Sequence, residues 1–474
     1  MLNKLPLLPI IAFISGFSLL VFELAAARIL APSIGSSTYV WTSVIGVIIA
    51  SLSIGYWVGG KWADARARIL DIVWICLAAA GTITSVLITY MSVLEWTVES
   101  IDDARVQGVV ASLLLFAPTS FLIGALSPYL VKLRITSLKT SGQSFASLSA
   151  LESIGGITGT FITGFILFGF IGARETFAVV VFLLLATSWL VTPSQQFGRR
   201  LAFTGIIAFF CIASLQMANG RQIDTASAHY SILEGTMDGE RVRGVATGPN
   251  GTQSGISLED PDKLIFWYTK QMAEVVAAAP NRDNILILGG GAFTLPQSLA
   301  TTYPESQIDV VEIDPELAGI AREYFNYRDP QNVNLIFEDA RTYINRATTK
   351  YDIILIDVYS DASVPFSLMT KEYGQNLRRL VAKDGIVAAN LIAGLSGPCG
   401  ELLGALDSPY RDVFSRAVYT IQRPYSPRSN IIVVYSDKAF AWRGAIPLDR
   451  RLATSYTDNY TPAEQLQESC HSSV

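Results

Sequence analysis

Hydrophobic residues form long uninterrupted runs before residue 217 and short runs divided by polar residues after it. A helix of about 20 apolar residues is long enough to cross the hydrocarbon core of a bilayer. We predict seven such spans, and with them a multi-span transmembrane domain at residues 1–217. The predicted spans are Leu7–Leu30, Tyr39–Gly60, Ile69–Met91, Val106–Leu130, Phe145–Gly169, Thr176–Val191 and Leu201–Met217.

Two kinds of residue stand out within these spans. Gly155, Gly159 and Gly164 in "GGITGTFITG" predict a small-residue face that lets a neighbouring helix approach closely. Ionisable groups also fall at or inside spans, at Glu23, Arg28 and Glu152. Such groups are costly in lipid and indicate a polar cavity inside the bundle. An interhelical ion pair, or snorkelling of Arg28 to the interface, is the alternative interpretation.

The second half of the chain alternates strand-like and helix-like segments. The strand-like segments are "NILIL", "IDVVEI", "VNLIF", "YDIILID" and "GIVAANLI", and the helices are predicted at Asp262–Ala278, from Thr294, from Pro315, around Arg341 and near Lys371–Leu380. This alternation predicts a parallel, doubly wound sheet, and the closing pair "SRAVYTIQ" and "NIIVVYS" predicts an antiparallel edge. We therefore expect a small β-rich subdomain at residues 218–261, a Rossmann-like domain at 262–440 and a polar C-terminal tail at 441–474.

Composition and charge exclude two classes of function. The net charge of −5 and the isoelectric point near 5.3 argue against a nucleic-acid partner, which would select a basic surface. Four scattered cysteines form no CxxC pair and predict no disulfide framework. With only two histidines, the chain also predicts no metal site.

The segment "ILILGGGAF" places three glycines directly after a buried strand. In a doubly wound sheet the ligand lies at the carboxyl ends of the strands, where glycine lets it approach the backbone. Glu312 follows Gly291 by 312 − 291 = 21 residues, close to the spacing at which an acid binds a ribose diol. No lysine or arginine lies in or just after the turn, so a nucleoside fits it better than a phosphate.

Two further acids follow the next strands. Asp339 in "FEDA" comes after the third strand, where a carboxylate can accept a hydrogen bond from an adenine amino group. Asp357 in "LIDVYSD" ends the fourth strand. A single exposed acid at a strand end is common, but three at successive strand ends favour a functional site.

These motifs resemble the spermidine synthase (polyamine aminopropyltransferase) family. The resemblance covers roughly residues 225–436 and rests on "ILILGGG", "VVEIDP", "EDARTYI" and "YDIILIDVYSD". The first half is similar to the multi-span segment of bacterial membrane-fused spermidine synthases, in "FISGFSLLVFELAAARIL", "SIGYWVGGKWAD", "PTSFLIGALSP" and "ESIGGITGTFITGFILFGFIG". The resemblance implies a methyltransferase-type Rossmann-like fold and a multi-pass protein of a bacterial inner membrane.

The resemblance also implies roles for individual residues. Asp357 would accept a proton from the attacking amine, with Tyr359 as a second catalytic group. The nucleoside of decarboxylated S-adenosylmethionine, or of S-adenosylmethionine itself, would be bound by Gly289, Gly291, Glu312, Asp339 and Ala340. The substrate would be lined by Gln253, Tyr268 and Asp361. No cofactor is implied beyond this sulfonium co-substrate.

Two departures from the family pattern bear on the reaction. The family's glycine turn continues with Asp and Gly, whereas Ala292 and Phe293 stand here. The missing Asp would bind the aminopropyl ammonium. In addition, Asp361 follows Asp357 by four residues rather than three. Both changes put ordinary spermidine synthesis in question and leave nucleoside binding intact.

Three functions remain open from the sequence. The first is aminopropyl transfer to an amine in polyamine biosynthesis, which releases methylthioadenosine. The second is breakdown of S-adenosylmethionine by its own carboxylate, which gives a lactone and methylthioadenosine. The third is a transporter or sensor with a regulatory nucleoside-binding domain, motivated by Glu23 and Glu152. The expected partners are a nucleoside sulfonium, a polyamine, the lipid bilayer and, as an open alternative, a second copy of the chain in a homodimer.

Basic residues in the loops predict the orientation in the membrane. Nine lie on one side of the predicted bundle and three on the other, which places the N-terminus in the cytoplasm and, with seven spans, the soluble half outside it. The nine are Lys4, Lys61, Arg66, Arg68, Lys132, Arg134, Lys139, Arg199 and Arg200, and the three are Arg28, Arg105 and Arg174. S-adenosylmethionine is made inside the cell, which favours the opposite side. If Leu201–Met217 lay along the interface, six crossings would return the soluble half to the cytoplasm, so the sequence leaves its side open.

Overall fold

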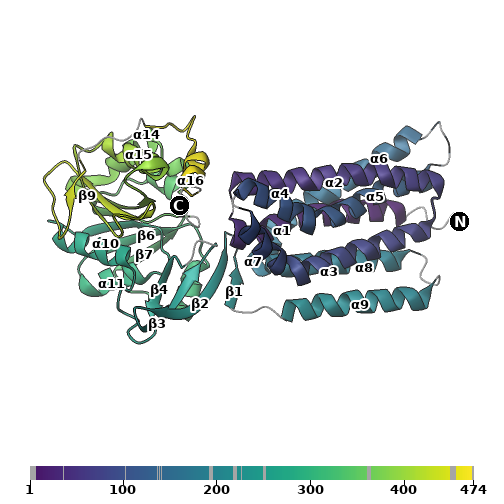
Figure 1. Cartoon of the computed structure of the whole chain (residues 1–474), viewed down its shortest axis with the longest axis horizontal. Coiled ribbons are helices and arrows are strands. Elements are labelled where there is room, and N and C mark those ends of the chain that lie inside the picture. Colours follow the sequence, from purple (N-terminus) through teal and green to yellow (C-terminus); the bar gives the residue numbers. More distant parts are fainter. Residues whose placement is uncertain are drawn as a thin grey trace. The chain divides into compact units, whose positions relative to one another are not determined.

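A computed structural model of the chain divides into two compact units, Met1–His229 (unit 1) and Tyr230–Val474 (unit 2). Figure 1 shows unit 1 as a bundle of long helices and unit 2 as a sheet with helices around it. The residues that the structure describes are 7–35, 37–101, 103–135, 137, 139, 141–191, 196–216, 221–225, 227–248, 252–359, 364–448 and 455–471.

Unit 1 consists mainly of long helices. They are α1 (Leu7–Ile34), α2 (Thr38–Ala65), α3 (Ile69–Ser100), α4 (Ala104–Leu115), α5 (Ala117–Arg134), α6 (Ser141–Ile162) with a π-helical segment (Thr163–Leu167) and α7 (Phe168–Phe170), α8 (Ala173–Leu190) and α9 (Phe197–Gln216), followed by β1 (Arg221–Asp224). The apolar composition of the long helices explains why a span-length pattern predicts them.

Six of the predicted spans correspond to described helices that are long and apolar enough to cross a membrane, by length and composition. The fourth predicted span corresponds to α4 and α5, which are bent by 55° and count as a seventh only if the pair is one span. The bend falls at Phe116, just before Pro118 in the first turn of α5. Proline ends a helix because it lacks the N–H that the preceding turn would bind.

Glycines on α6 bring that helix into backbone contact with α1. A Cβ on Gly155 would lie 2.1 Å from the carbonyl oxygen of Phe13, so only glycine permits this distance, and Gly159 packs on α1 in the same way. The predicted small-residue face is therefore confirmed at these two positions. It is wrong at Gly164, where an added Cβ would meet nothing within 4 Å.

Unit 2 is built on an eight-stranded sheet, counted over the described residues, in the order β12-β10-β11-β9-β8-β5-β6-β7. The strands are β5 (Asn284–Leu288), β6 (Gln307–Glu312), β7 (Val333–Phe337), β8 (Tyr351–Ile356), β9 (Val381–Ala393), β10 (Arg416–Ile421), β11 (Ser429–Ser436) and β12 (Ile446–Pro447). Strands β5 to β9 pair in parallel, and β9, β11, β10 and β12 pair antiparallel. The predicted methyltransferase-type fold is confirmed. The strand order reverses at β5, so the switch point lies at the carboxyl ends of β5 and β8.

The remaining elements of unit 2 cover or precede this sheet. The helices are α10 (Trp267–Ala278), α11 (Thr294–Thr302), α12 (Leu317–Tyr324), α13 (Ala340–Arg346), α14 (Lys371–Leu380), α15 (Gly397–Arg411) and α16 (Ala463–His471). Before them, β2 (His229–Met237), β3 (Glu240–Ala246) and β4 (Ser254–Ser257) form antiparallel hairpins within the segment predicted to be β-rich. Helix α10 begins five residues later than predicted, because Phe266 has an extended backbone.

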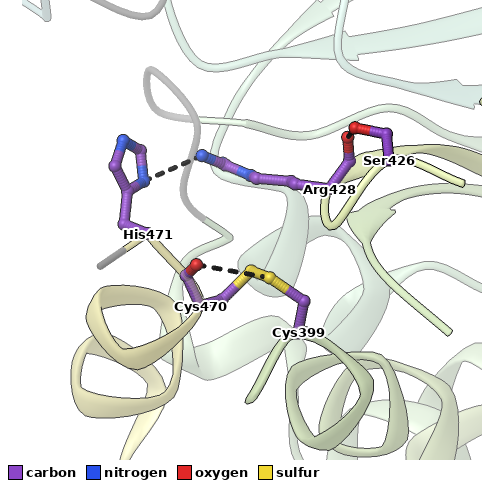
Figure 2. Close-up of a disulfide and its surroundings, with 5 residues drawn as sticks. All are labelled: Cys399, Ser426, Arg428, Cys470 and His471. Carbon is purple, nitrogen blue, oxygen red and sulfur yellow. Dashed lines mark hydrogen bonds between the residues drawn. A yellow bond between two sulfur atoms is a disulfide. The ribbon is translucent and has the colours of Figure 1, made fainter. Parts of the chain in front are cut away.

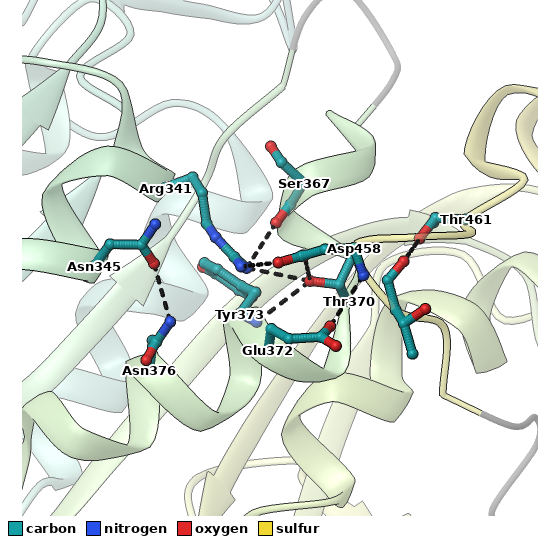
Figure 3. A network of polar contacts seen from close by, with 10 residues as sticks. Arg341, Asn345, Ser367, Thr370, Glu372, Tyr373, Asn376, Asp458 and Thr461 are labelled. Atoms are coloured by element: carbon teal, nitrogen blue, oxygen red, sulfur yellow. Dashed lines mark hydrogen bonds and ion pairs between the residues drawn. The ribbon is translucent and has the colours of Figure 1, made fainter.

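The C-terminal segment is packed into unit 2. A disulfide joins Cys399 on α15 to Cys470 on α16, 71 residues later (Figure 2). Figure 3 shows Asp458 accepting hydrogen bonds from the Arg341 guanidinium and the Thr370 hydroxyl, each at 2.6 Å. The disulfide corrects the prediction that the cysteines form no such pair, and composition alone did not indicate this packing of the residues after 441.

Candidate active site

The turn after β5 requires glycine at two positions. Gly289 and Gly291 have φ angles of +93° and +52°, in the left-handed region that side chains disfavour. A Cβ on Gly289 would also lie 2.2 Å from the carbonyl oxygen of Asp357. The N–H of Asp357 donates to the carbonyl oxygen of Leu288 at 2.9 Å. Glycine thus lets the ends of β5 and β8 meet, which fixes the turn beside the acid that ends β8.

Glu312, the last residue of β6, is bonded directly to this turn. Its Oε2 accepts the N–H of Gly290 at 2.7 Å, and its Oε1 accepts the N–H of Asp314 at 3.0 Å. Burial raises the pKa of Glu312, and these backbone hydrogen bonds act in the opposite direction. Each carboxylate oxygen keeps a further lone pair to which a ribose hydroxyl can donate.

Asp314, which lies in the loop after Glu312, also stabilises this part of unit 2. The sequence analysis did not predict it as a site residue. Its side chain is fully buried, and its two oxygens accept the Tyr230 hydroxyl at 2.9 Å and the N–H of Glu316 at 3.0 Å. Burial and the neighbouring carboxylates raise the pKa of the Tyr230 phenol, so it stays a neutral donor. The contact ties the β-rich hairpins to the loop after β6. The motif "EIDP", which ends in proline, contains Asp314. Nothing in the motif indicates that Tyr230 is its hydrogen-bond partner.

Asp339 lies at the start of α13, just beyond the carboxyl end of β7. Its Oδ1 accepts the N–H of Thr342 at 2.9 Å, so the residue caps the helix. The side chain is exposed, while the neighbouring Ala340 is buried. Because β7 is the parallel neighbour of β6, Asp339 shares the edge of the sheet that carries Glu312.

Asp357 follows β8 and is flanked by side chains from β9 and α10. Nδ2 of Asn390 donates to its Oδ1 at 2.9 Å. Burial raises the pKa of Asp357 to about 6, and the polar groups of Asn390 and Tyr268 act against that rise. A group with this pKa takes up and releases protons near neutral pH, which is what a general base requires.

Of the predicted substrate-lining residues, Tyr268 lies beside Asp357, and Gln253 is bonded to Tyr268. Burial and the Asp357 carboxylate raise the pKa of the Tyr268 phenol well above its usual range. The Tyr268 hydroxyl donates to the carbonyl oxygen of Gln253 at 2.9 Å. Nε2 of Gln253 donates to Oγ1 of Thr247 at 2.5 Å. Gln253 therefore contributes its backbone to the position of Tyr268, while Tyr268 itself lies beside the acid.

Tyr359 is held against the backbone of β9. Its hydroxyl donates to the carbonyl oxygen of Asn390 at 2.7 Å and accepts the N–H of Ile392 at 2.8 Å. Burial raises the pKa of this phenol strongly. The arrangement suits a group that positions Asn390, and through it Asp357. Asp361, the other candidate after β8, lies outside the described residues.

Asn390 is a further residue of this site that the sequence did not reveal. It is buried on β9, and its Oδ1 has no hydrogen-bond partner among the described residues. A single amide inside the apolar run "GIVAANLI" is the one signal that sequence carries for it. Among the described residues, no three His, Cys, Asp or Glu side chains lie close enough together to hold a metal ion.

A parallel sheet with a glycine turn and acids at its switch point defines a Rossmann-like domain of the methyltransferase type. Residues 265–391 match the family model of the spermine/spermidine synthase domain. Over these residues the chain is similar to the spermidine synthase family.

Individual relatives match the same half of the chain. A polyamine aminopropyltransferase of Vibrio vulnificus is 33% identical over 180 residues, 37% of this chain and 58% of that protein. A probable polyamine aminopropyl transferase of Bifidobacterium longum is 30% identical over 35% of this chain and 36% of its own length. The crystal structure of a probable spermidine synthase from Corynebacterium glutamicum is 25% identical, with a TM-score of 0.41 over 48% of this chain and 82% of that one. The chain thus spans little more than half of the first of these curated relatives and about a third of the second.

Proposed function

We propose that the protein is a membrane-bound, aminopropyltransferase-like enzyme. It transfers the aminopropyl group of decarboxylated S-adenosylmethionine to an amine, a step of polyamine biosynthesis, and releases methylthioadenosine. The observation that carries the proposal is the Asp357 carboxylate, whose pKa of about 6 suits a base, at the switch point beside the glycine turn. The similarity to polyamine aminopropyltransferases supports the same reaction.

The chemistry needs a base near an electrophilic carbon. The sulfonium makes the methylene carbon beside it electrophilic. An amine with a pKa near 10 is protonated at neutral pH and must lose a proton before it attacks. The amine nitrogen then bonds to the methylene carbon, the carbon–sulfur bond breaks, and its electron pair stays on sulfur. Asp357 attracts the ammonium, orients it and accepts the proton.

The neighbouring residues supply binding and position. Glu312 accepts the ribose hydroxyls, and Asp339 accepts the adenine amino group. Gly289 and Gly291 shape the turn at which the nucleoside meets backbone, since their positive φ angles suit residues without a side chain. Tyr268 remains a neutral donor beside the acid, because burial raises the pKa of its phenol.

A second reaction is favoured by the sequence of the turn. Ala292 stands where the family carries an ammonium-binding Asp, and it is buried. The next residue, Phe293, packs its ring on Tyr327 at a centroid distance of 5.1 Å. Without that Asp, intact S-adenosylmethionine is a candidate substrate: its carboxylate oxygen attacks the carbon next to sulfur, the carbon–sulfur bond breaks, and homoserine lactone and methylthioadenosine result.

A transporter or sensor with a regulatory nucleoside domain is the third possibility, and the buried carboxylate of Glu152 in unit 1 favours it.

One assay separates the three functions. The purified full-length protein is incubated with each sulfonium compound, with and without putrescine, and methylthioadenosine is measured. Release that requires the amine supports aminopropyl transfer, and release from S-adenosylmethionine alone supports the lyase. No release leaves the regulatory role. In parallel, calorimetry with methylthioadenosine tests the site itself, because Glu312→Ala is expected to abolish binding; unchanged affinity would contradict the role of Glu312.

A further inference from the structure

Unit 1 contains a cavity that the proposed reaction does not use. It has a volume of about 960 Å³ and lies among α1, α2, α5 and α6. Leu20 and Ile123 contribute to its apolar wall, while Tyr56, Ser127 and Glu152 bring polar atoms to it. A volume of this size lies within the range of about 300–1,000 Å³ that is typical of small-molecule sites.

The walls of this cavity are two closely packed helix pairs, α1 with α6 and α2 with α5. A Cβ on Gly16 would lie 1.9 Å from the carbonyl oxygen of Glu152, and one on Gly55 would lie 2.2 Å from that of Phe121. Glycine therefore allows backbone contact within each pair. The two pairs pack less extensively against each other, and the cavity lies between them. Glu152 thus projects its side chain from a rigid seam.

The carboxylate of Glu152 has an unused oxygen. Its Oε2 accepts the hydroxyl of Ser127 at 3.0 Å. Its Oε1 is buried and has no hydrogen-bond partner among the described residues. Lys132, which also lines the cavity, is bonded instead to Asp64 at 2.7 Å. A buried carboxylate without a partner is costly, so this group either takes up a proton or has a cation beside it, and no described side chain is bonded to its Oε1.

The chemistry of the cavity points to an organic cation. A divalent metal ion needs six or more oxygen ligands, or near-octahedral geometry, and one carboxylate with one hydroxyl does not provide them. The apolar walls suit a methylene chain or a ring system beside the charge. An alkylammonium or sulfonium compound has both parts.

We propose that this cavity is a binding site for an organic cation, an ammonium or sulfonium compound, with Glu152 as its counter-ion and Ser127 as the group that orients the carboxylate. The site stands on the geometry of unit 1 alone, and only the choice of probes rests on the proposed function. Spermidine and S-adenosylmethionine are the two probes, and neutral methylthioadenosine distinguishes recognition of charge from recognition of the nucleoside.

Binding is measured by equilibrium dialysis with radiolabelled probes on the full chain in lipid nanodiscs. The background carries Glu312→Ala and Asp357→Asn, so that the site in unit 2 is disabled. We expect saturable binding of at least one probe, no competition by methylthioadenosine, and weakening by about tenfold or more in Glu152→Gln, because the neutral amide no longer attracts the cation. Glu23→Gln is the matched control, since this glutamate lies on α1 but does not line the cavity, and it is expected to bind as the background does.

Several outcomes would overturn the inference: no binding above empty nanodiscs, competition by methylthioadenosine, or equal affinity in Glu152→Gln. If Glu152→Gln fails to give monodisperse protein, Glu152→Asp replaces it, and the same weakening is expected because the charge is withdrawn by one methylene. Methylthioadenosine release is measured on otherwise wild-type protein with and without Glu152→Gln. Cation binding without any release would refute the proposed function and leave this site standing.

Discussion

At the scale of single residues, the proposed reaction depends most on Asp357. Asp357→Asn keeps the shape and can still accept from Asn390, but it can neither take a proton nor attract an ammonium. Turnover is expected to fall by about 10²-fold or more, the contribution of general base catalysis, while methylthioadenosine affinity stays nearly constant. Release kinetics and calorimetry on the same preparations measure the two quantities.

Asp352→Asn is the matched control for this change. Asp352 lies on the same strand and accepts the N–H of Asn284, away from the carboxyl end of β8. Its variant is expected to retain turnover. If Asp357→Asn retained it too, the base would have to be another group, with Asp361 the next candidate.

The ionised carboxylate of Asp357 is needed for the proposed reaction, and we expect it to lower the stability of the fold. Burial raises the pKa of Asp357 from 3.8 to about 6, so the folded state holds this proton more tightly than the unfolded state does. The ionised group therefore destabilises the fold by an amount that is absent below about pH 4 and complete above about pH 6, on the order of 3 kcal/mol at neutral pH. Asp357→Asn is expected to unfold at a higher temperature than the wild type at pH 7. The difference should vanish toward pH 4, and a difference independent of pH would refute its electrostatic origin.

Sequence predicted part of this site for a physical reason. The glycine turn and Glu312 are separated by a nearly fixed length of helix and strand, so spacing alone pairs them, and the structure joins them through the N–H of Gly290. Asn390 and Tyr230 were missed because their partners are set by sheet register and hairpin packing. The role of Asp339 in binding stays a prediction, since in the structure it also caps α13.

At the scale of elements, hydrophobic periodicity predicted the helices and strands that have a clear pattern in their own sequence. It did not predict those that depend on contacts with distant residues. Strand β5 occupies the predicted "NILIL", and α14 begins and ends where the pattern placed it. Strand β12 and helix α16 were not predicted. Strand β12 has only two residues and is defined by its pairing with β10. Helix α16 is short and polar, and its attachment depends on Cys470 and on contacts with α15.

The disulfide predicts a stability effect that is separate from activity. Cys399→Ser with Cys470→Ser frees the end of α16 and is expected to destabilise unit 2 by about 2–4 kcal/mol, since the bond constrains a long loop of the unfolded chain. Neither cysteine belongs to the candidate site, so methylthioadenosine release is expected to persist at low temperature. Thermal unfolding with and without reductant measures the effect. Reductant should lower the melting temperature of the wild type and leave the double variant unchanged; equal melting temperatures of the two oxidised proteins would contradict the prediction.

At the scale of the whole molecule, the change in composition near residue 217 anticipated two differently built parts. The contacts of the chain divide it at His229, inside the segment predicted as β-rich. Hydropathy predicts such a division because its mean value along the sequence is high throughout a membrane-length apolar run. It is much lower in a segment where apolar and polar residues alternate. Loop charge and substrate supply disagreed about the side of the membrane, and sequence had no third observation to decide between them.

The disulfide supplies that observation. Structural disulfides form and persist in oxidising compartments and are rare in the cytosol. Cys399 and Cys470 are both buried, as expected of a structural pair. If α4 and α5 count as one span, seven crossings with the basic loops inside predict that unit 2 lies outside the cytoplasm, and the disulfide favours the same side. The two arguments are independent, because one rests on lysines and arginines of unit 1 and the other on cysteines of unit 2. We therefore expect unit 2 to lie on the outer side of the membrane.

Fusion proteins in a Gram-negative host test this orientation. Alkaline phosphatase folds only where its own disulfides form, so a fusion after Asp224, beyond α9, is expected to be active, and a GFP fusion at the same position is expected to be dark. A phosphatase fusion after Arg68, in the basic loop between α2 and α3, is the matched control and is expected to be inactive. Fluorescent GFP and inactive phosphatase after Asp224 would instead place unit 2 in the cytoplasm. An outer location has a consequence for supply: S-adenosylmethionine made inside the cell must then cross the membrane to reach Asp357, and the Glu152 cavity becomes the first place to look for its passage.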